Sequence, residues 1–203
     1  QLAFRLISSL GRVNQTSLKT GKLRDQDWDR IDGAILQMKD MPIYIDDTPS
    51  LTPVELRARA RRIQREKGLS LIVVDYLQLM QVPGSKENRA TEISEISRNL
   101  KALARELKIP IIALSQLNRS VEQRGGEIPR MSDLRDSGAI EQDADLIAFI
   151  YRHDVSDPDN VDRKGEAEIS LAKQRNGPTG KFKLTFLGDY TKFENYIQGY
   201  KEY

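Results

Sequence analysis

Two short apolar segments, with one long amphipathic segment between them, constrain the fold of this chain more than any other feature. The apolar segments are LSLIVV (69–74) and IPIIAL (109–114). Between them, apolar side chains recur at steps of three and four residues, at Ile93, Ile96, Leu100, Leu103 and Leu107. This spacing is the period of one helix face, and nearly continuous apolar strands are typical of a parallel sheet that helices cover on both faces. The sequence therefore predicts an α/β fold with a mainly parallel sheet and flanking helices.

Local signals predict further elements before this unit. Helices are expected at 1–12 and 25–38, and a short strand at 42–47. Another helix is expected to begin after Thr52, because Thr52 and Glu55 have the spacing of a capping box, and to end at Gly68.

The last third of the chain has a different pattern. A third apolar strand is expected at 145–151, and three strand-like segments follow with only turn-like breaks between them: EAEISLAKQ, GKFKLTFLG and KFENY. Short breaks favour antiparallel hairpin strands at the C-terminal end. Two long polar connections, 117–133 and 152–165, also occur, and loops of this length inside a compact domain are usually functional or disordered.

Composition limits the class of protein and the kinds of site. The 203 residues are enough for one domain or two small ones, and a net charge of +2 indicates no acidic partner by itself. There is no cysteine and one histidine, His153, which excludes disulfides and thiolate or histidine-rich metal sites. No run approaches the roughly 20 apolar residues that span a bilayer, so we expect a cytoplasmic protein with no membrane association. Gln1 lies within an amphipathic pattern, from which we expect the chain to be part of a longer protein.

Two polar residues follow the apolar strands of the predicted sheet. Asp75 comes directly after the first strand and Gln116 after the second. Ligands of open α/β sheets collect at the carboxyl ends of the strands, where an aspartate can hold the Mg²⁺ of a bound nucleotide. Gln116 can both donate and accept hydrogen bonds, so it could sense a terminal phosphate or position a water. The alternatives are a strand-end aspartate that caps a turn and a glutamine that caps a loop.

Two further segments carry candidate anion-binding groups. In AKQRNGPTG (172–180), Lys173 and Arg175 project to the same side of an extended segment and could clamp phosphate, even in a neighbouring subunit. In SDLRDSG (132–138), Arg135, Ser137 and the backbone at Gly138 could hold a nucleic-acid phosphate at a helix start. The alternatives are two exposed basic residues at a turn and an ordinary capped helix.

The phosphate-binding loop that should accompany Asp75 is missing from the sequence. A P-loop requires the pattern G-x-x-x-x-G-K-[ST]. The segment KTGKL (19–23) fails this pattern, because Thr16 stands at the first glycine position and Leu23 at the Ser/Thr position. If Asp75 binds a nucleotide's metal ion, we expect the phosphate loop to lie upstream of Gln1.

Several long segments, in order, resemble one family. They are SLIVVDYLQLM, NRATEISEISRNLKALARELKIPIIALSQLNRSVEQR, SDLRDSGAIEQDADLIAFIYR and KQRNGPTGKFKLTF. They closely resemble the motor domain of the bacterial replicative DNA helicases of the DnaB family, from the first residues to about residue 196. The resemblance implies a RecA-like core and a ring of six subunits that hydrolyses ATP with Mg²⁺ at subunit interfaces. It also implies 5′ to 3′ movement on single-stranded DNA, and a primase and a helicase loader as partners.

The resemblance also implies roles for individual residues. Asp75 resembles the Walker B acid that holds Mg²⁺ through water, and Gln116 resembles the γ-phosphate sensor. Within KQRNG, Lys173, Gln174 and Arg175 resemble residues at the adjacent subunit's ATP site, with Arg175 as the arginine finger. The expected DNA contacts on the channel-facing loops are Arg119, Arg124, Arg135, Asp136 and Gly138. Arg5, in QLAFR, resembles an arginine near the nucleotide.

The chain departs from the family at its front. The family's Walker A lysine and threonine, its catalytic glutamate and its N-terminal helical domain are all expected before Gln1. Residues 1–203 are therefore expected to be a partial motor domain that cannot turn over ATP alone and that has exposed apolar edges where sheet strands are missing. The alternatives are a RecA-type DNA-binding or regulatory module without helicase activity, and an interaction module for a primase or loader.

Overall fold

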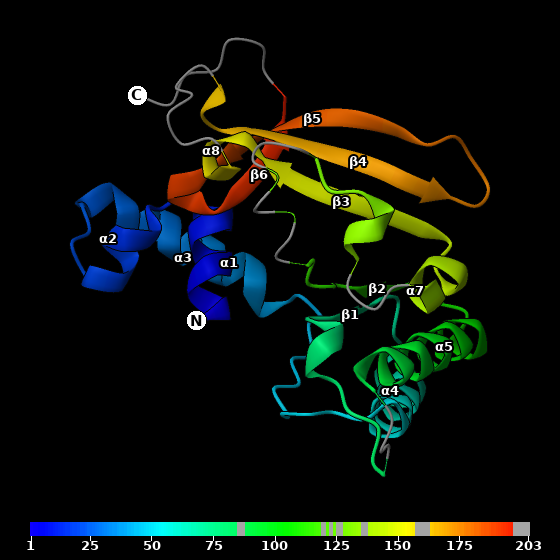
Figure 1. Ribbon diagram of the computed structural model, residues 1–203. Coiled ribbons are helices and arrows are strands. Elements are labelled where there is room, and N and C mark those ends of the chain that lie inside the picture. Colours follow the sequence, from blue (N-terminus) through cyan, green and yellow to red (C-terminus); the bar gives the residue numbers. More distant parts are fainter. Residues whose placement is uncertain are drawn as a thin grey trace. The chain divides into compact units, whose positions relative to one another are not determined.

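The computed structural model describes residues 1–84, 88–118, 121, 124, 128–134, 138–156 and 163–196. The chain divides into two compact units. Unit 1 comprises residues 1–45, 150–169 and 181–203, and unit 2 comprises residues 46–149 and 170–180. Figure 1 shows the elements of both units along the chain. Among the described helices, none is long and apolar enough to cross a membrane.

Unit 1 begins with three helices, α1 (Leu2–Gly11), α2 (Gln15–Thr20) and α3 (Asp25–Lys39). α1 and α3 match the helices that the sequence predicts, whereas α2 was not predicted. α1 and α3 pack closely at Gly11, where an added Cβ would lie 2.8 Å from the carbonyl oxygen of Arg30. The buried hydroxyl of Ser8 donates to the carbonyl oxygen of Val13 at 2.6 Å, which fixes the chain as it leaves α1.

The expected strand at 42–47 is wrong. Residues 41–48 form neither helix nor strand, and Ile43 and Ile45 are 54% and 66% exposed. An alternating apolar pattern produces a strand only when a neighbouring strand takes up its backbone hydrogen bonds. No described strand pairs with this segment.

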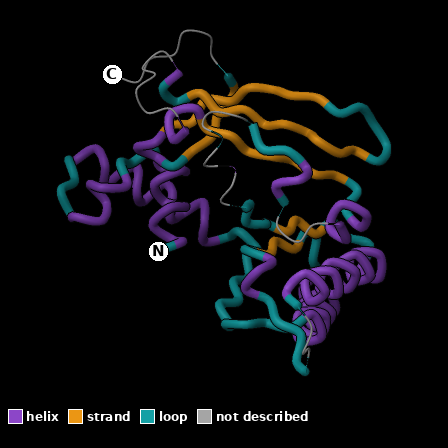
Figure 2. Tube along the Cα trace, in the orientation of Figure 1, coloured by secondary structure: helices purple, strands orange, loops and turns teal. Residues whose placement is uncertain are grey.

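Unit 2 holds α4 (Pro53–Lys67), β1 (Ile72–Val74), a 3₁₀ turn at Leu77–Leu79, α5 (Arg89–Leu107) and β2 (Ile111–Ala113). β1 and β2 are parallel, with Ile72 opposite Ile111 and Val74 opposite Ala113. The predicted strand–helix–strand unit is therefore confirmed, although both strands are shorter than the apolar segments. In Figure 2 the two short strands lie beside the long helices.

The core of unit 2 forms where α4 and α5 cover one face of β1 and β2. The predicted helix face of α5 is buried, with Ile93 and Ile96 fully inaccessible to solvent. Ala60 of α4, Ile72 of β1 and Leu103 of α5 form a second buried cluster. The apolar faces of α4, α5 and β1 thus pack against one another in one core.

The opposite face of β1 and β2 is open, which contradicts the expectation of a sheet covered on both faces. Its apolar side chains alternate with the buried ones and are 42–57% exposed: Leu71, Val73, Ile112 and Leu114. Nearly continuous apolar strands indicate burial on both faces in a parallel sheet. Within the described residues, helices and strands of unit 2 supply only one of the two covers.

The remaining strands form a separate four-stranded sheet in the order β3-β4-β5-β6. Their bounds are β3 (Leu146–Arg152), β4 (Glu166–Gln174), β5 (Gly180–Leu187) and β6 (Lys192–Asn195). Residues 175–179 join β4 to β5 as a hairpin, and β5 and β6 pair antiparallel with Phe186 opposite Phe193. The C-terminal hairpin strands are confirmed. β3 belongs to this sheet and does not pair with β2. Every second side chain along β3 is buried, so its apolar run is buried on one face and not on both.

The capping box at α4 gives a direct test of a local signal. The hydroxyl oxygen of Thr52 accepts from the Glu55 N–H at 3.2 Å, and the Glu55 carboxylate accepts from the Thr52 N–H at 2.9 Å. We expect Thr52→Ala to lower the free energy of unfolding by about 1 kcal/mol, because a helix-end N–H loses its partner, whereas Thr52→Ser keeps the cap. Urea denaturation of both variants checks this, and equal losses for alanine and serine would contradict it.

Candidate functional site

Asp75 and Gln116 follow strands that end at the same edge of a parallel pair. After the last paired residues, the Leu114 N–H donates to the Val74 carbonyl and the Leu77 N–H donates to the Leu114 carbonyl, both at 2.9 Å. Asp75 lies between these two bonds along its strand, and Gln116 lies two residues past Leu114. The structure therefore places both residues at the carboxyl end of the sheet in unit 2, where α/β folds collect their ligands.

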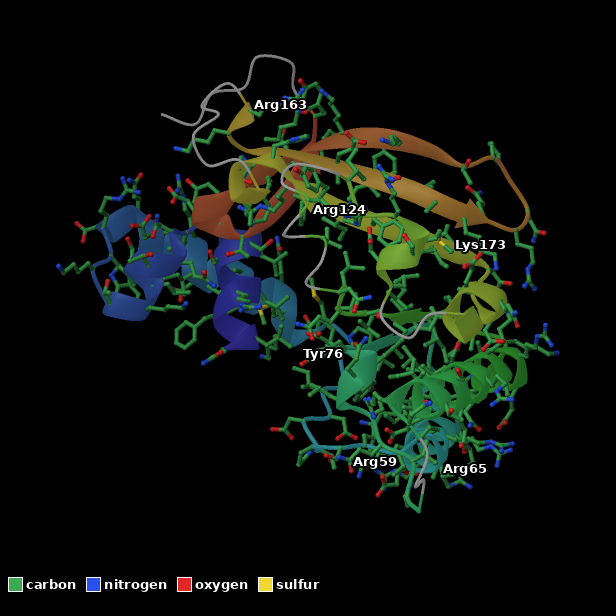
Figure 3. All side chains as sticks on the ribbon, in the orientation of Figure 1. Arg59, Arg65, Tyr76, Arg124, Arg163 and Lys173 are labelled. Atoms are coloured by element: carbon green, nitrogen blue, oxygen red, sulfur yellow. The ribbon has the colours of Figure 1, made fainter. Side chains whose placement is uncertain are left out.

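Both side chains at this edge are exposed and free to bind. Neither the Asp75 carboxylate nor the Gln116 side-chain amide bonds to another residue in the part of the chain that the structure describes. A carboxylate with no partner can accept from metal-bound water, and a free amide can donate to a phosphate oxygen. In Figure 3 the neighbouring Tyr76 marks the end of β1.

A single carboxylate suits Mg²⁺ bound to a nucleotide. No group of three or more histidine, aspartate or glutamate side chains converges as a metal cluster among the described residues. Mg²⁺ commonly takes only one or two protein carboxylates and completes its shell with water and phosphate oxygens. Asp75 fits such a site as its protein ligand.

The chain after Gln116 is anchored to a second segment. Leu117 forms an antiparallel bridge with Leu134, and the Asn118 N–H donates to the Asp133 carbonyl at 2.9 Å. Asp133 is only 4% exposed, and its carboxylate pairs with Arg124 and accepts from the Arg130 N–H at 2.7 Å. This anchor ends directly before residues 135–137, so it connects the sheet edge to the predicted DNA loop.

The Asp133 anchor is expected to weaken in acid. Burial alone would raise the pKa of Asp133, but the hydrogen bonds from Arg124 and the Arg130 N–H, with the nearby positive charges, lower it below 3.8. A lowered pKa means that the carboxylate stabilises the fold above pH 3.8 and that this stabilisation is lost as pH falls through the lower folded value. We expect the gap in unfolding free energy between wild type and Asp133→Ala to be full near neutral pH and to shrink below about pH 3.8. Chemical denaturation across this range measures the gap, and a constant gap would contradict the assignment.

Lys173 and Arg175 bind the C-terminal end of a short helix in unit 2. This helix, α7 (Gly138–Asp143), begins at the predicted DNA residue Gly138. The Lys173 ammonium donates to the Glu141 carbonyl, and the Arg175 guanidinium donates to the Gln142 carbonyl at 3.0 Å. Cations favour the last turn of a helix because free carbonyls and the helix dipole make it negative. Figure 3 shows Lys173 at the end of β4, beside α7 and apart from Tyr76.

Asp145 is the acidic partner of Arg175 and of Lys101. Its backbone carbonyl accepts from the Arg175 N–H at 2.8 Å, and its carboxylate lies 3.5 Å from the Arg175 guanidinium and pairs with Lys101 of α5. The hydrogen bond from Lys101, despite some opposing burial, lowers the pKa of Asp145 below its ordinary value. The side chains of Arg175 and Asp145 are 45% and 59% exposed. Arg175 is thus held loosely at the surface, where a second molecule can reach it.

The other predicted site residues are placed as follows. Arg5 lies exposed on α1 in unit 1. Gln174 lies at the end of β4, with its side-chain amide over Gly177 at the hairpin turn. Arg124 is partly buried in its ion pair with Asp133. Arg119, Arg135, Asp136 and Ser137 lie outside the described residues. The nucleotide and DNA roles of all these residues stay predictions.

Three residues of this region were missed from the sequence: Gln78, Asp133 and Asp145. Asp133 accepts from the N–H of Arg130 three residues earlier, which is a local contact, although an arginine is not an N-cap residue. Asp145 and Gln78 carry no comparable local signal, because their partners lie on elements far away in the sequence.

Comparisons with known proteins show the family of this chain. The DnaB-like helicase C terminal domain family matches residues 1–195. The chain is 59% identical over 198 residues to the replicative DNA helicase DnaB of Buchnera aphidicola subsp. Acyrthosiphon pisum, covering 97% of this chain and 43% of that protein. It is 52% identical over 203 residues to the DnaB of Geobacillus stearothermophilus, covering 44% of it. The chain thus spans less than half the length of these curated relatives.

Solved structures show the same fold. A DnaB-like replicative helicase, studied for its interactions with primase, superposes with a TM-score of 0.91 at 38% identity, over 96% of this chain and 47% of that one. A second solved structure, of an ATPase domain, superposes with a TM-score of 0.90, also at 38% identity, over 96% of this chain and 70% of that one. The α/β fold class, with its RecA-like resemblance and hairpin strands, is therefore confirmed. The chain belongs to the DnaB-like helicase C-terminal domain family.

Proposed function

We propose that this chain is part of the motor domain of a replicative DNA helicase. The observation that carries the proposal is that a free carboxylate, Asp75, and a free amide, Gln116, both lie at the carboxyl end of one parallel strand pair in a chain of this family. In this proposal the full-length protein hydrolyses ATP and moves 5′ to 3′ along single-stranded DNA as a ring of six subunits in the cytoplasm. A primase and a helicase loader are its proposed partners.

Each site residue has one part in this function. Asp75 would hold Mg²⁺ through water, and the metal ion, when bound, neutralises charge on the phosphates. Gln116 would donate to the terminal phosphate and respond to its loss. Lys173, Gln174 and Arg175 would reach the nucleotide of the adjacent subunit, whereas Arg5 would lie near the nucleotide.

The anchor after Gln116 supports a connection between ATP and DNA. Leu117 and Asn118 are bonded to residues 133–134, which directly precede Arg135 and Asp136. The response of Gln116 to the phosphate is therefore proposed to reach the segment that binds DNA phosphates with Arg119, Arg124 and Gly138. Because such contacts go to the backbone, we expect little sequence preference and a steep fall in affinity with added salt.

The test compares the full-length gene product with the 203-residue chain. We expect the full-length protein to show Mg²⁺-dependent ATPase activity that single-stranded DNA stimulates, and to displace a strand from a forked duplex. We expect the 203-residue chain to be inactive, because it contains no P-loop pattern. ATPase activity without strand displacement would favour a RecA-type DNA-binding or regulatory module. Clear ATPase activity of the 203-residue chain would contradict the proposal that this chain alone has an incomplete nucleotide site.

A further inference from the structure

We propose that Gln78 is a positioning residue that holds the backbone of Gln116 in place for phosphate sensing. This inference rests on the proposed function, since it concerns how Gln116 performs its part. The side-chain amide of Gln78 makes three hydrogen bonds to the segment that contains Gln116. Its Nε2 donates to the Ser115 hydroxyl at 3.0 Å and to the Gln116 carbonyl at 3.4 Å. Its Oε1 accepts from the Gln116 N–H at 3.2 Å.

These bonds begin where the sheet ends. The last bonds between the two strand segments run from the Leu114 N–H to Val74 and from the Leu77 N–H to Leu114. Beyond them, the chain after β1 turns into the 3₁₀ turn at Leu77–Leu79 and no longer runs beside Gln116. The Gln78 amide then both donates to and accepts from the Gln116 backbone, as a residue in a neighbouring strand would. An amide side chain carries its donor and its acceptor side by side, as this arrangement requires.

The backbone around Gln78 is held by Arg89 and by the hydrophobic core of unit 2. The guanidinium of Arg89, in the first turn of α5, donates to the carbonyl oxygens of Gln78 at 2.8 Å and of Met80 at 3.2 Å. Leu77 and Met80, on either side of Gln78 in the sequence, are each only 3% exposed and belong to the same core as Ile93. The bonds to Gln116 therefore start from a rigid base, which is what a supporting residue needs.

Gln116 is thus fixed through its backbone while its side chain stays free. Gln78 bonds to the Gln116 backbone itself, and Leu117 and Asn118 are bonded to residues 133–134 just after it. The exposed side chain has no partner among the described residues. A sensor with a fixed backbone starts from a defined position at the edge of the sheet, and a misplacement of about 1 Å near a reacting group can cost about 10²-fold in rate.

The experiment replaces Gln78 in the full-length gene product. We expect Gln78→Leu to lower the kcat of DNA-stimulated ATP hydrolysis by about 10- to 100-fold, with the KM for ATP little changed, because Gln78 bonds to the Gln116 backbone and is not one of the residues proposed to bind the nucleotide. We expect amide hydrogen exchange in residues 115–117 to become faster. Gln78→Glu keeps the acceptor for the Gln116 N–H but loses both donated bonds, so an intermediate loss is expected. Gln81→Leu, on an exposed glutamine three residues further on, is the matched control and should leave kcat and exchange unchanged.

A double-mutant cycle separates positioning from a general structural role. In a Gln116→Ala background, Gln78→Leu should lower kcat no further, because the residue that it positions is absent. Unchanged exchange at 115–117 with wild-type kcat in Gln78→Leu would overturn the inference, as would a full additional loss in the double variant. If Gln78→Leu does not fold, Gln78→Glu carries the same two readouts. A wild-type protein without ATPase activity would overturn the proposed function, and the exchange measurement would still decide whether Gln78 holds this segment.

Discussion

Arg175→Ala in the full-length protein is expected to lower DNA-stimulated ATP turnover by about 10³- to 10⁵-fold, the range for arginine fingers in related phosphoryl-transfer enzymes. The guanidinium is held by the Gln142 carbonyl and by a 3.5 Å pair with the half-exposed Asp145. Exposed pairs of this kind contribute little stability, so Arg175 can leave them for a phosphate on a neighbouring subunit. A steady-state ATPase assay measures the loss. Lys181→Ala, a cation on the other arm of the same hairpin, is the control and should change turnover little.

Mixed assemblies show whether Arg175 acts on a neighbouring subunit. Asp75→Asn subunits lack the metal ligand but keep the finger, whereas Arg175→Ala subunits lack the finger but keep the metal ligand. If each site takes one residue from each of two subunits, mixing the two inactive variants restores some sites and a measurable part of the activity. A mixture as inactive as either variant alone would contradict the assignment between subunits.

Ile93→Ala is expected to destabilise the 203-residue chain by about 2–5 kcal/mol, because it leaves a cavity in the core between α5 and the 3₁₀ turn. Ile93 is fully buried and packs in a cluster with Leu77, Met80 and Ile96. Urea denaturation followed by circular dichroism measures the loss. The control is Ile112→Ala on the open face of β2, where the side chain is 50% exposed and a change of about 0.5 kcal/mol is expected. Similar losses at both positions would show that the open face of β1 and β2 is covered in solution.

The sequence predicts those elements whose signals are local. The capping box of Thr52 and Glu55 defines the start of α4, and the helical period of Ile93, Ile96 and Leu100 defines the buried face of α5. The strand predicted at 42–47 is absent from the described structure because a strand also depends on a partner, which no local pattern can supply.

The candidate site also has some features that local signals predict and others that depend on distant partners. The position of Asp75 and Gln116 at the same edge of the sheet could be predicted, because two parallel strands that are joined by one helix end at a common edge. The hydrogen bonds from Gln78 to Gln116 could not be predicted, because they depend on the register between β1 and β2. The surroundings of Arg175 could not be predicted either, since Asp145 and the end of α7 meet the hairpin only after the four-stranded sheet has formed.

The way that the chain alternates between its two units affects how the protein can fold during synthesis. Unit 2 needs residues 46–149 and also 170–180, and unit 1 joins residues 1–45 to residues 150–169 and 181–203. A ribosome that adds about 5–20 residues per second takes on the order of 10 s to proceed from residue 45 to residue 181. Throughout that time α1 and α3 lack residues 181–203 of their unit, and Phe4 and Trp28 on these helices are exposed even in the finished fold. The N-terminal helices therefore complete their unit only after the last strands have been synthesised.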